Sequence, residues 1–213
     1  MVKLAIFDVD FTLTKRETLI ELYRFMLKKN PKLIKYIPRG VYSGLMYAIK
    51  VYSADRCKEC FLKFIEDVHE EKMKELVKEF YETRLSKILY EDAIDTIKKH
   101  KKEGCLIYLI SASPEFYLNE LYAIKEVDKI IGTRITNENG YYKKKIHGVN
   151  CKGEEKVKRL KEVLDNDNLE VDFENSYMYS DSLSDLPLFN IVGHPYLINY
   201  KKGHDKIEIL NWK

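Results

Sequence analysis

Two aspartates directly follow the first apolar run of the chain, and this feature constrains the fold more than any other. The β-prone run Leu4–Phe7 ends in Asp8 and Asp10, two residues apart. Because side chains alternate between faces along a strand, both carboxylates start on the same side. Converging carboxylates at the end of a buried strand repel each other and are costly to desolvate. A hard cation such as Mg²⁺ would remove that cost, whereas an acidic surface turn is the alternative interpretation.

The composition indicates a globular protein with nearly balanced charge. The chain has 213 residues, of which 45% are hydrophobic and 33% charged, and its net charge is +3. This length suits one domain, or a core with a small inserted module. Basic clusters occur at 98–102 and 143–145, where solvated faces are favoured over a nucleic-acid surface. No nucleic-acid partner is therefore expected.

The apolar segments predict a cytoplasmic protein without a membrane span. The first apolar run carries acids at once, unlike a signal peptide. Val41–Val51 is too short to cross a bilayer. Four cysteines without a secretory signal predict reduced thiols. Cys57 and Cys60 form a single CxxC, for which helix packing is favoured over a zinc or redox site because no second pair accompanies it.

Strand-like runs alternate with helical periodicity through most of the chain. The strand-like runs are Val2–Asp8, Cys105–Ser111, Ile130–Ile135, Tyr177–Asp181 and Tyr196–Asn199. Helical periodicity covers Glu91–Lys102 and Glu154–Leu164 between them. This alternation predicts an α/β fold, a Rossmann-like three-layer αβα sandwich with a parallel sheet. Asn139-Gly140 predicts a small hairpin.

Residues 15–85 break this alternation. They contain no convincing strand, and apolar residues recur at helical spacing in Thr18–Lys29 and Lys72–Leu85. We expect residues 15–85 to form an inserted α-helical cap, and residues 1–14 and 86–213 to form the core. A module inserted directly after the first strand would lie over the strand ends.

Polar groups also follow the later strands, where ligands bind in open parallel sheets. Ser111 closes the second strand, just before a helix whose free N–H groups suit an anion. Lys152 and Lys156 flank a helix start, where a cation opposes the helix dipole and indicates an anionic partner. Asp181 and Asp185 follow another apolar strand. The strand ends thus supply two acids, a hydroxyl, a lysine and two acids.

This order of groups resembles the haloacid dehalogenase-like hydrolases over essentially the whole chain. The matching motifs are Asp8-Val9-Asp10-Phe11-Thr12-Leu13-Thr14 (D-x-D-x-T), Ser111, the lysine near Gly153, and Asp181 with Asp185. A helical cap between the first two motifs is similar to the branch that includes phosphoserine phosphatases. The resemblance implies a hydrolase of small-molecule phosphate monoesters.

Three positions bear on phosphoserine as the substrate. Glu17 matches the position of a substrate-amine acid in phosphoserine phosphatases. However, Ser111-Ala112-Ser113 replaces the usual Ser-Gly-Gly, and Phe11 replaces a small residue. These departures count against phosphoserine itself.

The resemblance also implies a two-step phosphoryl transfer with Mg²⁺. Asp8 would attack phosphorus and form an aspartyl-phosphate, while Asp10 would protonate the leaving group and then activate water. Mg²⁺ would be held by Asp8, the backbone carbonyl of Asp10, and Asp181.

The remaining motif residues would bind phosphate or support the site. Thr12, Ser111 and Lys156 are the expected phosphate-binding groups, with Lys152 as the alternative lysine. Asp185 would support the metal's water shell or orient the lysine, or else cap the helix that follows.

Rival interpretations concern the cap and the activity. Ile34–Tyr52 holds four tyrosines among apolar residues. We expect this segment to form the core of the cap. The alternative is a pocket for an apolar or lipid phosphate, such as phosphatidylglycerophosphate or lysophosphatidate, with peripheral membrane contact. A phosphomutase is another enzyme alternative. A non-catalytic phospho-ligand binding protein is disfavoured because so many unliganded charges would destabilise it.

Overall fold

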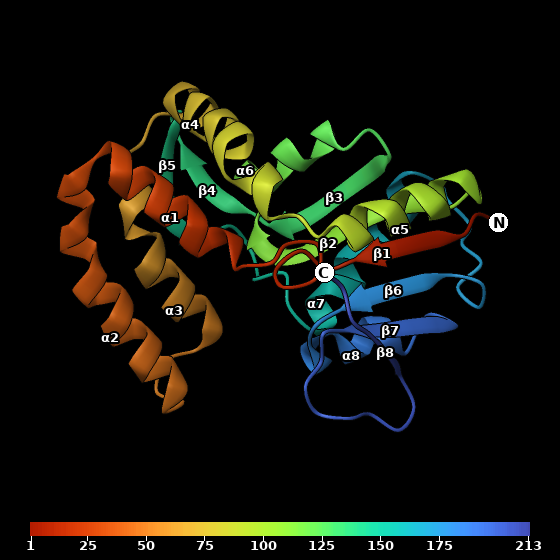
Figure 1. Ribbon diagram of the computed structural model, residues 1–213. Coiled ribbons are helices and arrows are strands. Elements are labelled where there is room, and N and C mark those ends of the chain that lie inside the picture. The colour runs from red at the N-terminus through yellow and green to blue at the C-terminus, as the bar shows by residue number, and fades with distance from the viewer.

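A six-stranded parallel sheet forms the centre of the molecule. The computed structural model describes all residues, 1–213. The strands are β1 (Leu4–Phe7), β2 (Leu106–Pro114), β3 (Val127–Thr133), β6 (Tyr177–Ser180), β7 (His194–Ile198) and β8 (Glu208–Leu210). Their order is β3-β2-β1-β6-β7-β8, with β1 paired to β2 and β6 (Figure 1). The predicted α/β fold is confirmed, although the short strand β8 was not predicted.

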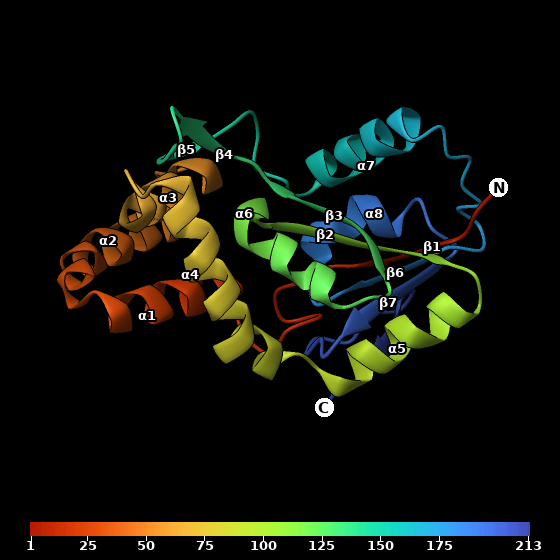
Figure 2. The ribbon, with the colours of Figure 1, turned by 90° about the horizontal axis from the view of Figure 1, so that it is seen from above.

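Helices cover both faces of this sheet. Helix α5 (Glu91–Lys102) lies on one side, and α7 (Glu154–Asn166) and α8 (Leu186–Phe189) lie on the other (Figure 2). Within β1, Ala5 and Phe7 join one apolar cluster, whereas its other two residues join the second. A strand buried on both faces needs an unbroken apolar run, which explains the opening sequence.

The segment between β1 and β2 is almost entirely helical. It contains α1 (Thr18–Lys29), α2 (Ile37–Ala48), α3 (Ala54–Phe61) and α4 (Glu70–Thr83), with 3₁₀ turns at Pro31–Tyr36, Leu62–Ile65 and Leu85–Ile88. No strand of the six-stranded sheet comes from residues 15–85, and α2 and α3 lie beyond the strand ends (Figure 1). We propose that residues 15–85 form a cap over a core of residues 1–14 and 86–213.

A separate hairpin extends the helical segment. Strands β4 (Ile135–Glu138) and β5 (Tyr141–Ile146) pair antiparallel around Asn139 and Gly140, whose φ angles are 52° and 81°. Positive φ at both turn residues is typical of the tight turn that an Asn-Gly pair favours. The Glu70 N–H donates to the Gly140 carbonyl at 2.8 Å. The hairpin therefore packs on the helical segment, although its sequence position lies in the proposed core.

Helix α2 does not form cap core, and that prediction is wrong. Only Ser43 of this helix is buried, because its inner side packs on α3 and the rest has no cover. Val41 is 68% exposed and Leu45 is 56% exposed. None of the helices, α2 included, combines the length and apolar character needed to cross a membrane.

Candidate active site

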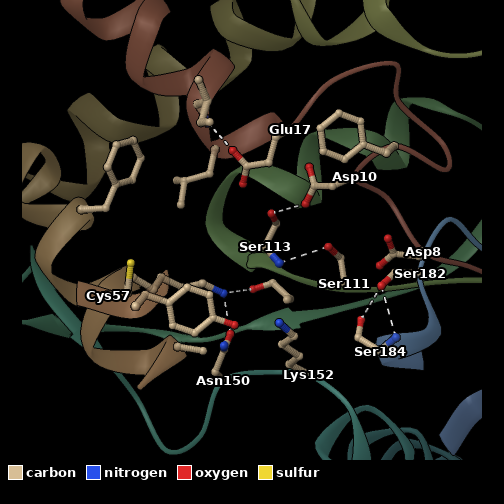
Figure 3. A pocket seen from close by; sticks show the side chains of 18 of the residues that line it. Asp8, Asp10, Glu17, Cys57, Ser111, Ser113, Asn150, Lys152, Ser182 and Ser184 are labelled. Carbon is tan, nitrogen blue, oxygen red and sulfur yellow. Dashed lines mark hydrogen bonds between the residues drawn. The ribbon is translucent and has the colours of Figure 1, made fainter. Parts of the chain in front are cut away.

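A buried lysine joins two of the aspartates at the strand ends. Lys156 Nζ donates to Asp8 Oδ1 and to Asp185 Oδ2, each at 2.7 Å. Lys156 lies in the first turn of α7 and is 2% exposed. Gly153 precedes this helix with a φ of 59°, a backbone region that favours glycine and that turns the chain into α7. Lys152, by contrast, is exposed at the cavity edge (Figure 3).

The site holds more negative charge than this lysine balances. Burial raises the pKa of Asp8 to about 8, against the opposing effect of Lys156. Burial and the neighbouring Asp185 raise the pKa of Asp181 to about 6. Burial alone would lower the pKa of Lys156, but Asp8 and Asp185 outweigh it and raise that pKa. Asp185 Oδ1 is buried without a hydrogen-bond partner.

This donor set suits a divalent cation. Asp8 and Asp181 follow the neighbouring strands β1 and β6, so their carboxylates emerge at the same edge of the sheet. Carboxylate and carbonyl oxygens are the ligands that Mg²⁺ prefers, and the surplus negative charge favours a cation. The residues that would hold it are Asp8, Asp181 and the backbone carbonyl of Asp10.

The carboxylate of Asp10 is fixed by groups from two other elements. Its Oδ1 accepts from the Thr18 N–H at 2.6 Å and from Thr18 Oγ1 at 2.7 Å. Its Oδ2 accepts from Ser113 Oγ at 2.6 Å (Figure 3). Sequence reasoning missed both partners. Ser113 could have been found from its spacing to Ser111, since β2 continues three residues past the predicted end and alternate residues share a face.

Of the two hydroxyls predicted to bind phosphate, that of Ser111 lines the cavity and that of Thr12 does not. Ser111 is buried, lines the cavity, and accepts from the Ser113 N–H at 3.0 Å. Thr12 is fully buried, lies outside the cavity wall, and accepts from the Asp181 N–H at 2.8 Å. The direct phosphate contact predicted for Thr12 does not fit this placement, because its hydroxyl points to the loop that carries Asp181.

A cavity of about 770 Å³ lies between these groups and the helical segment (Figure 3). The polar residues just described gather at the strand ends, on the side of the cavity that we call its floor. The helices α1, α2 and α3 form the opposite side, the upper wall, which is largely apolar: Leu19, Ile20, Tyr23, Ile37, Val41, Tyr47 and Phe61. Phe11 lies at the edge with a φ of 59°, a strained conformation for a bulky residue, and such strain is frequent at functional sites.

Two charged residues of the helical segment face the cavity. Glu17 is the N-cap of α1 and accepts from the Ile20 N–H at 2.9 Å. Burial and the charge of Asp10 raise the pKa of Glu17 to about 7. Lys58 of α3 donates to the Ala112 carbonyl at 2.6 Å, and burial lowers its pKa to about 8.

Lys58 was not predicted, because only the folded chain brings α3 to the end of β2. It stands inside the CxxC sequence. The cysteines that flank it, Cys57 and Cys60, are half-buried free thiols, and Cys57 lines the cavity.

The chain belongs to the haloacid dehalogenase-like hydrolases, whose family model matches residues 5–190. A Mycobacterium tuberculosis H37Rv protein named "probable phosphatase" is 28% identical over 131 residues, which cover 62% of this chain and 45% of that protein. The chain thus spans about half the length of the mycobacterial relative. The histidinol-phosphatase of Neisseria meningitidis serogroup C is 26% identical over 207 residues, with 93% of this chain and 91% of that protein covered.

Solved structures share the fold. A Bordetella pertussis Tohama I protein of unknown function has a TM-score of 0.86 at 24% identity, covering 95% of this chain and 92% of that chain. A substrate-bound phosphoserine phosphatase has a TM-score of 0.66 at 18% identity, covering 94% and 88%. The molecule is thus structurally close to phosphoserine phosphatase-like proteins.

Replacing Lys156 tests the ion-pair cluster. Lys156→Met leaves Asp8 and Asp185 buried without their cation, so we expect the free energy of unfolding at pH 8, measured in urea without metal, to fall by about 3–5 kcal/mol. Lys152→Met is the matched control and should change it by less than about 0.5 kcal/mol, because Lys152 is exposed. Equal losses for both variants would contradict the assignment of Lys156 as the buried partner.

Proposed function

We propose that this protein is a Mg²⁺-dependent phosphatase that hydrolyses a phosphate monoester of a small metabolite through an aspartyl-phosphate intermediate. One observation carries the proposal: Asp8 is held by Lys156, which also pairs with Asp185, at the floor of a cavity that also contains Asp10 and Asp181. Membership of the haloacid dehalogenase-like hydrolases supports it.

Asp8 is the proposed nucleophile. Lys156 engages Oδ1 of Asp8, which leaves the second carboxylate oxygen without a protein partner. A carboxylate can attack phosphorus and form a covalent intermediate, which divides one difficult displacement into two easier ones. Bound Mg²⁺ would offset the repulsion between this carboxylate and the phosphate oxygens. Asp185 would keep Lys156 in position for the same purpose.

Asp10 is the proposed general acid and base. Its Oδ1 is fixed by the Thr18 N–H, whereas Oδ2 faces only the hydroxyl of Ser113. A hydroxyl donates or accepts by rotating its proton. Ser113 can therefore donate to the Asp10 carboxylate and accept from the carboxylic acid, so Oδ2 is the oxygen suited to carry the transferred proton. The proton would go to the leaving oxygen and return from the attacking water.

The phosphate itself would be bound by the remaining polar groups of the floor. Ser111 supplies a hydroxyl and Lys156 a charge, while Lys152 at the cavity edge would contact the ester as it enters. Thr12 would act indirectly by holding the loop of Asp181.

Glu17 and Lys58 would meet the leaving group. Both belong to the helical segment and line the cavity above the floor. The Neisseria relative is named histidinol-phosphatase and one solved neighbour is a phosphoserine phosphatase, and histidinol phosphate and phosphoserine both carry an amine. Glu17 is the group here that could pair with such an amine.

A phosphate ester with an apolar chain is the second candidate substrate. The observation that favours it is the upper cavity wall, where residues such as Leu19, Val41 and Phe61 leave few polar partners for a hydrophilic leaving group. An apolar chain would bury surface there.

Hydrolysis of p-nitrophenyl phosphate tests the proposed reaction. We expect Mg²⁺-dependent release of phosphate, and we expect Asp8→Asn to lower turnover by at least ~10³-fold, because it removes the anionic nucleophile but keeps the shape. Asp10→Asn should cost more on an alkyl phosphate than on p-nitrophenyl phosphate, whose leaving group needs little protonation.

Two results would count against this mechanism. Near-native turnover by Asp8→Asn would exclude the covalent route. An equal loss on both esters for Asp10→Asn would exclude its role as general acid.

The ionisation of Glu17 predicts a pH dependence of substrate binding. Because the pKa of Glu17 is raised to about 7, its carboxylate is mostly protonated at pH 6 and ionised at pH 8. At pH 8, Glu17→Gln should raise KM for an amine-bearing phosphate ester about 30- to 150-fold. At pH 6 the increase in KM should be much smaller, because Glu17 is then already mostly uncharged. Its KM for p-nitrophenyl phosphate, which has no amine, should barely change. A KM effect that does not vary with pH would remove Glu17 from amine recognition.

A further inference from the structure

The segment from Leu22 to Ala54 carries a strong positive charge. It contains seven basic residues and no acidic residue, in a chain whose total net charge is only +3. Arg24 and Lys29 pair with acids outside the segment. The other five form no ion pair: Lys28, Lys32, Lys35, Arg39 and Lys50. This part of the molecule is therefore a basic surface on a protein that is otherwise net acidic.

The same segment exposes an apolar helix face. Helical spacing places Val41, Leu45 and Ile49 in one row along α2 and its C-terminal end. Their exposed fractions are 68%, 56% and 57%, and the neighbouring Tyr42 is 55% exposed. The face of α2 that a globular protein normally buries thus points to solvent, and the exposed basic residues Arg39 and Lys50 lie near the two ends of this row. A helical segment of this kind is typical of proteins that lie on a membrane surface.

This face is continuous with the rim of the cavity. Ile37 and Val41 are exposed on α2 and also line the cavity that reaches Asp8. Figure 1 shows α2 at the outer edge of the molecule, with α3 beside it. A flat surface covering α2 would therefore lie at the mouth of the candidate site.

The positive charge around α2 indicates which partner could cover its apolar face. A second copy docked through α2 would bring two basic segments together, and like charges across an interface are costly. Anionic lipid headgroups complement the basic residues, while the apolar row and the tyrosines suit the boundary between headgroups and acyl chains. We propose that the outer face of α2, with its flanking basic residues, binds the surface of an anionic lipid bilayer.

Vesicle flotation with the full chain tests this surface without using turnover. The probes are phosphatidylcholine vesicles with and without phosphatidylglycerol. We expect binding only to the anionic vesicles, weakened by salt because the headgroup charge is screened. Leu45→Glu combined with Ile49→Glu should reduce the bound fraction at least about tenfold, since neither residue lines the cavity and both charges would oppose the lipid.

A pair of matched variants isolates the basic residues. Lys35→Gln with Lys50→Gln should weaken anionic vesicle binding about tenfold. Lys98→Gln with Lys102→Gln makes the same change of net charge on α5, far along the chain, and should leave binding unchanged. All four replaced lysines are exposed, so the variants are expected to fold, and circular dichroism checks this.

Three results would overturn the proposal. One is the absence of binding to anionic vesicles by the unmodified chain. Another is an equal loss in the α2 and α5 variants, which would mean that net charge alone acts. The third is a dimer in sedimentation velocity that Leu45→Glu with Ile49→Glu disperses, without vesicle binding, which would assign the face to a second copy. Vesicle binding with no p-nitrophenyl phosphate hydrolysis would instead contradict the proposed function, and it would still support the outer face of α2 as a lipid-binding surface.

Discussion

The ion pairs of Lys156 with Asp8 and Asp185 are the interaction on which the rest of the site depends. The fold brings acids from the ends of β1 and β6 into a buried region where carboxylates are costly. A single lysine at the start of α7 offsets part of that cost and fixes one oxygen of Asp8. The part of the cost that remains raises the pKa values of Asp8 and Asp181. A bound divalent cation would offset it. The proposed reactivity and the local instability of the site thus have one cause.

Sequence patterns predicted the sheet well because its strands are short apolar runs bounded by acids, serines or turns. Asp8, Ser111 and Asp181 could be placed at one edge for the same reason, since parallel strands deliver their carboxyl ends together. The contacts that involve the helical segment could not be predicted. Thr18 reaches Asp10, and Lys58 reaches the Ala112 carbonyl, only because α1 and α3 fold back over the strand ends, and no local pattern specifies that return.

Helix α2 shows a different limit of sequence reasoning. Its apolar residues have ordinary helical spacing, and spacing alone does not say whether a partner element covers them. The structure leaves the row through Leu45 uncovered, because α3 packs against this helix on the side of Ser43. The expected helical cap of residues 15–85 included this segment, but its assignment to the cap core was wrong. Ile37 and Val41 of this helix also line the cavity, on its apolar side away from the aspartates.

Trapping of the phosphorylated enzyme tests the central claim, that the phosphoryl group passes to Asp8, most directly. The enzyme would be mixed with Mg²⁺ and a substrate, quenched in acid during turnover, and treated with borohydride, which reduces an acyl phosphate to an alcohol. Peptide mass spectrometry then locates the reduced side chain. We expect reduction at position 8, and none when Mg²⁺ is left out. Turnover with an unmodified Asp8, or a phosphoryl group trapped on a different residue, would contradict it.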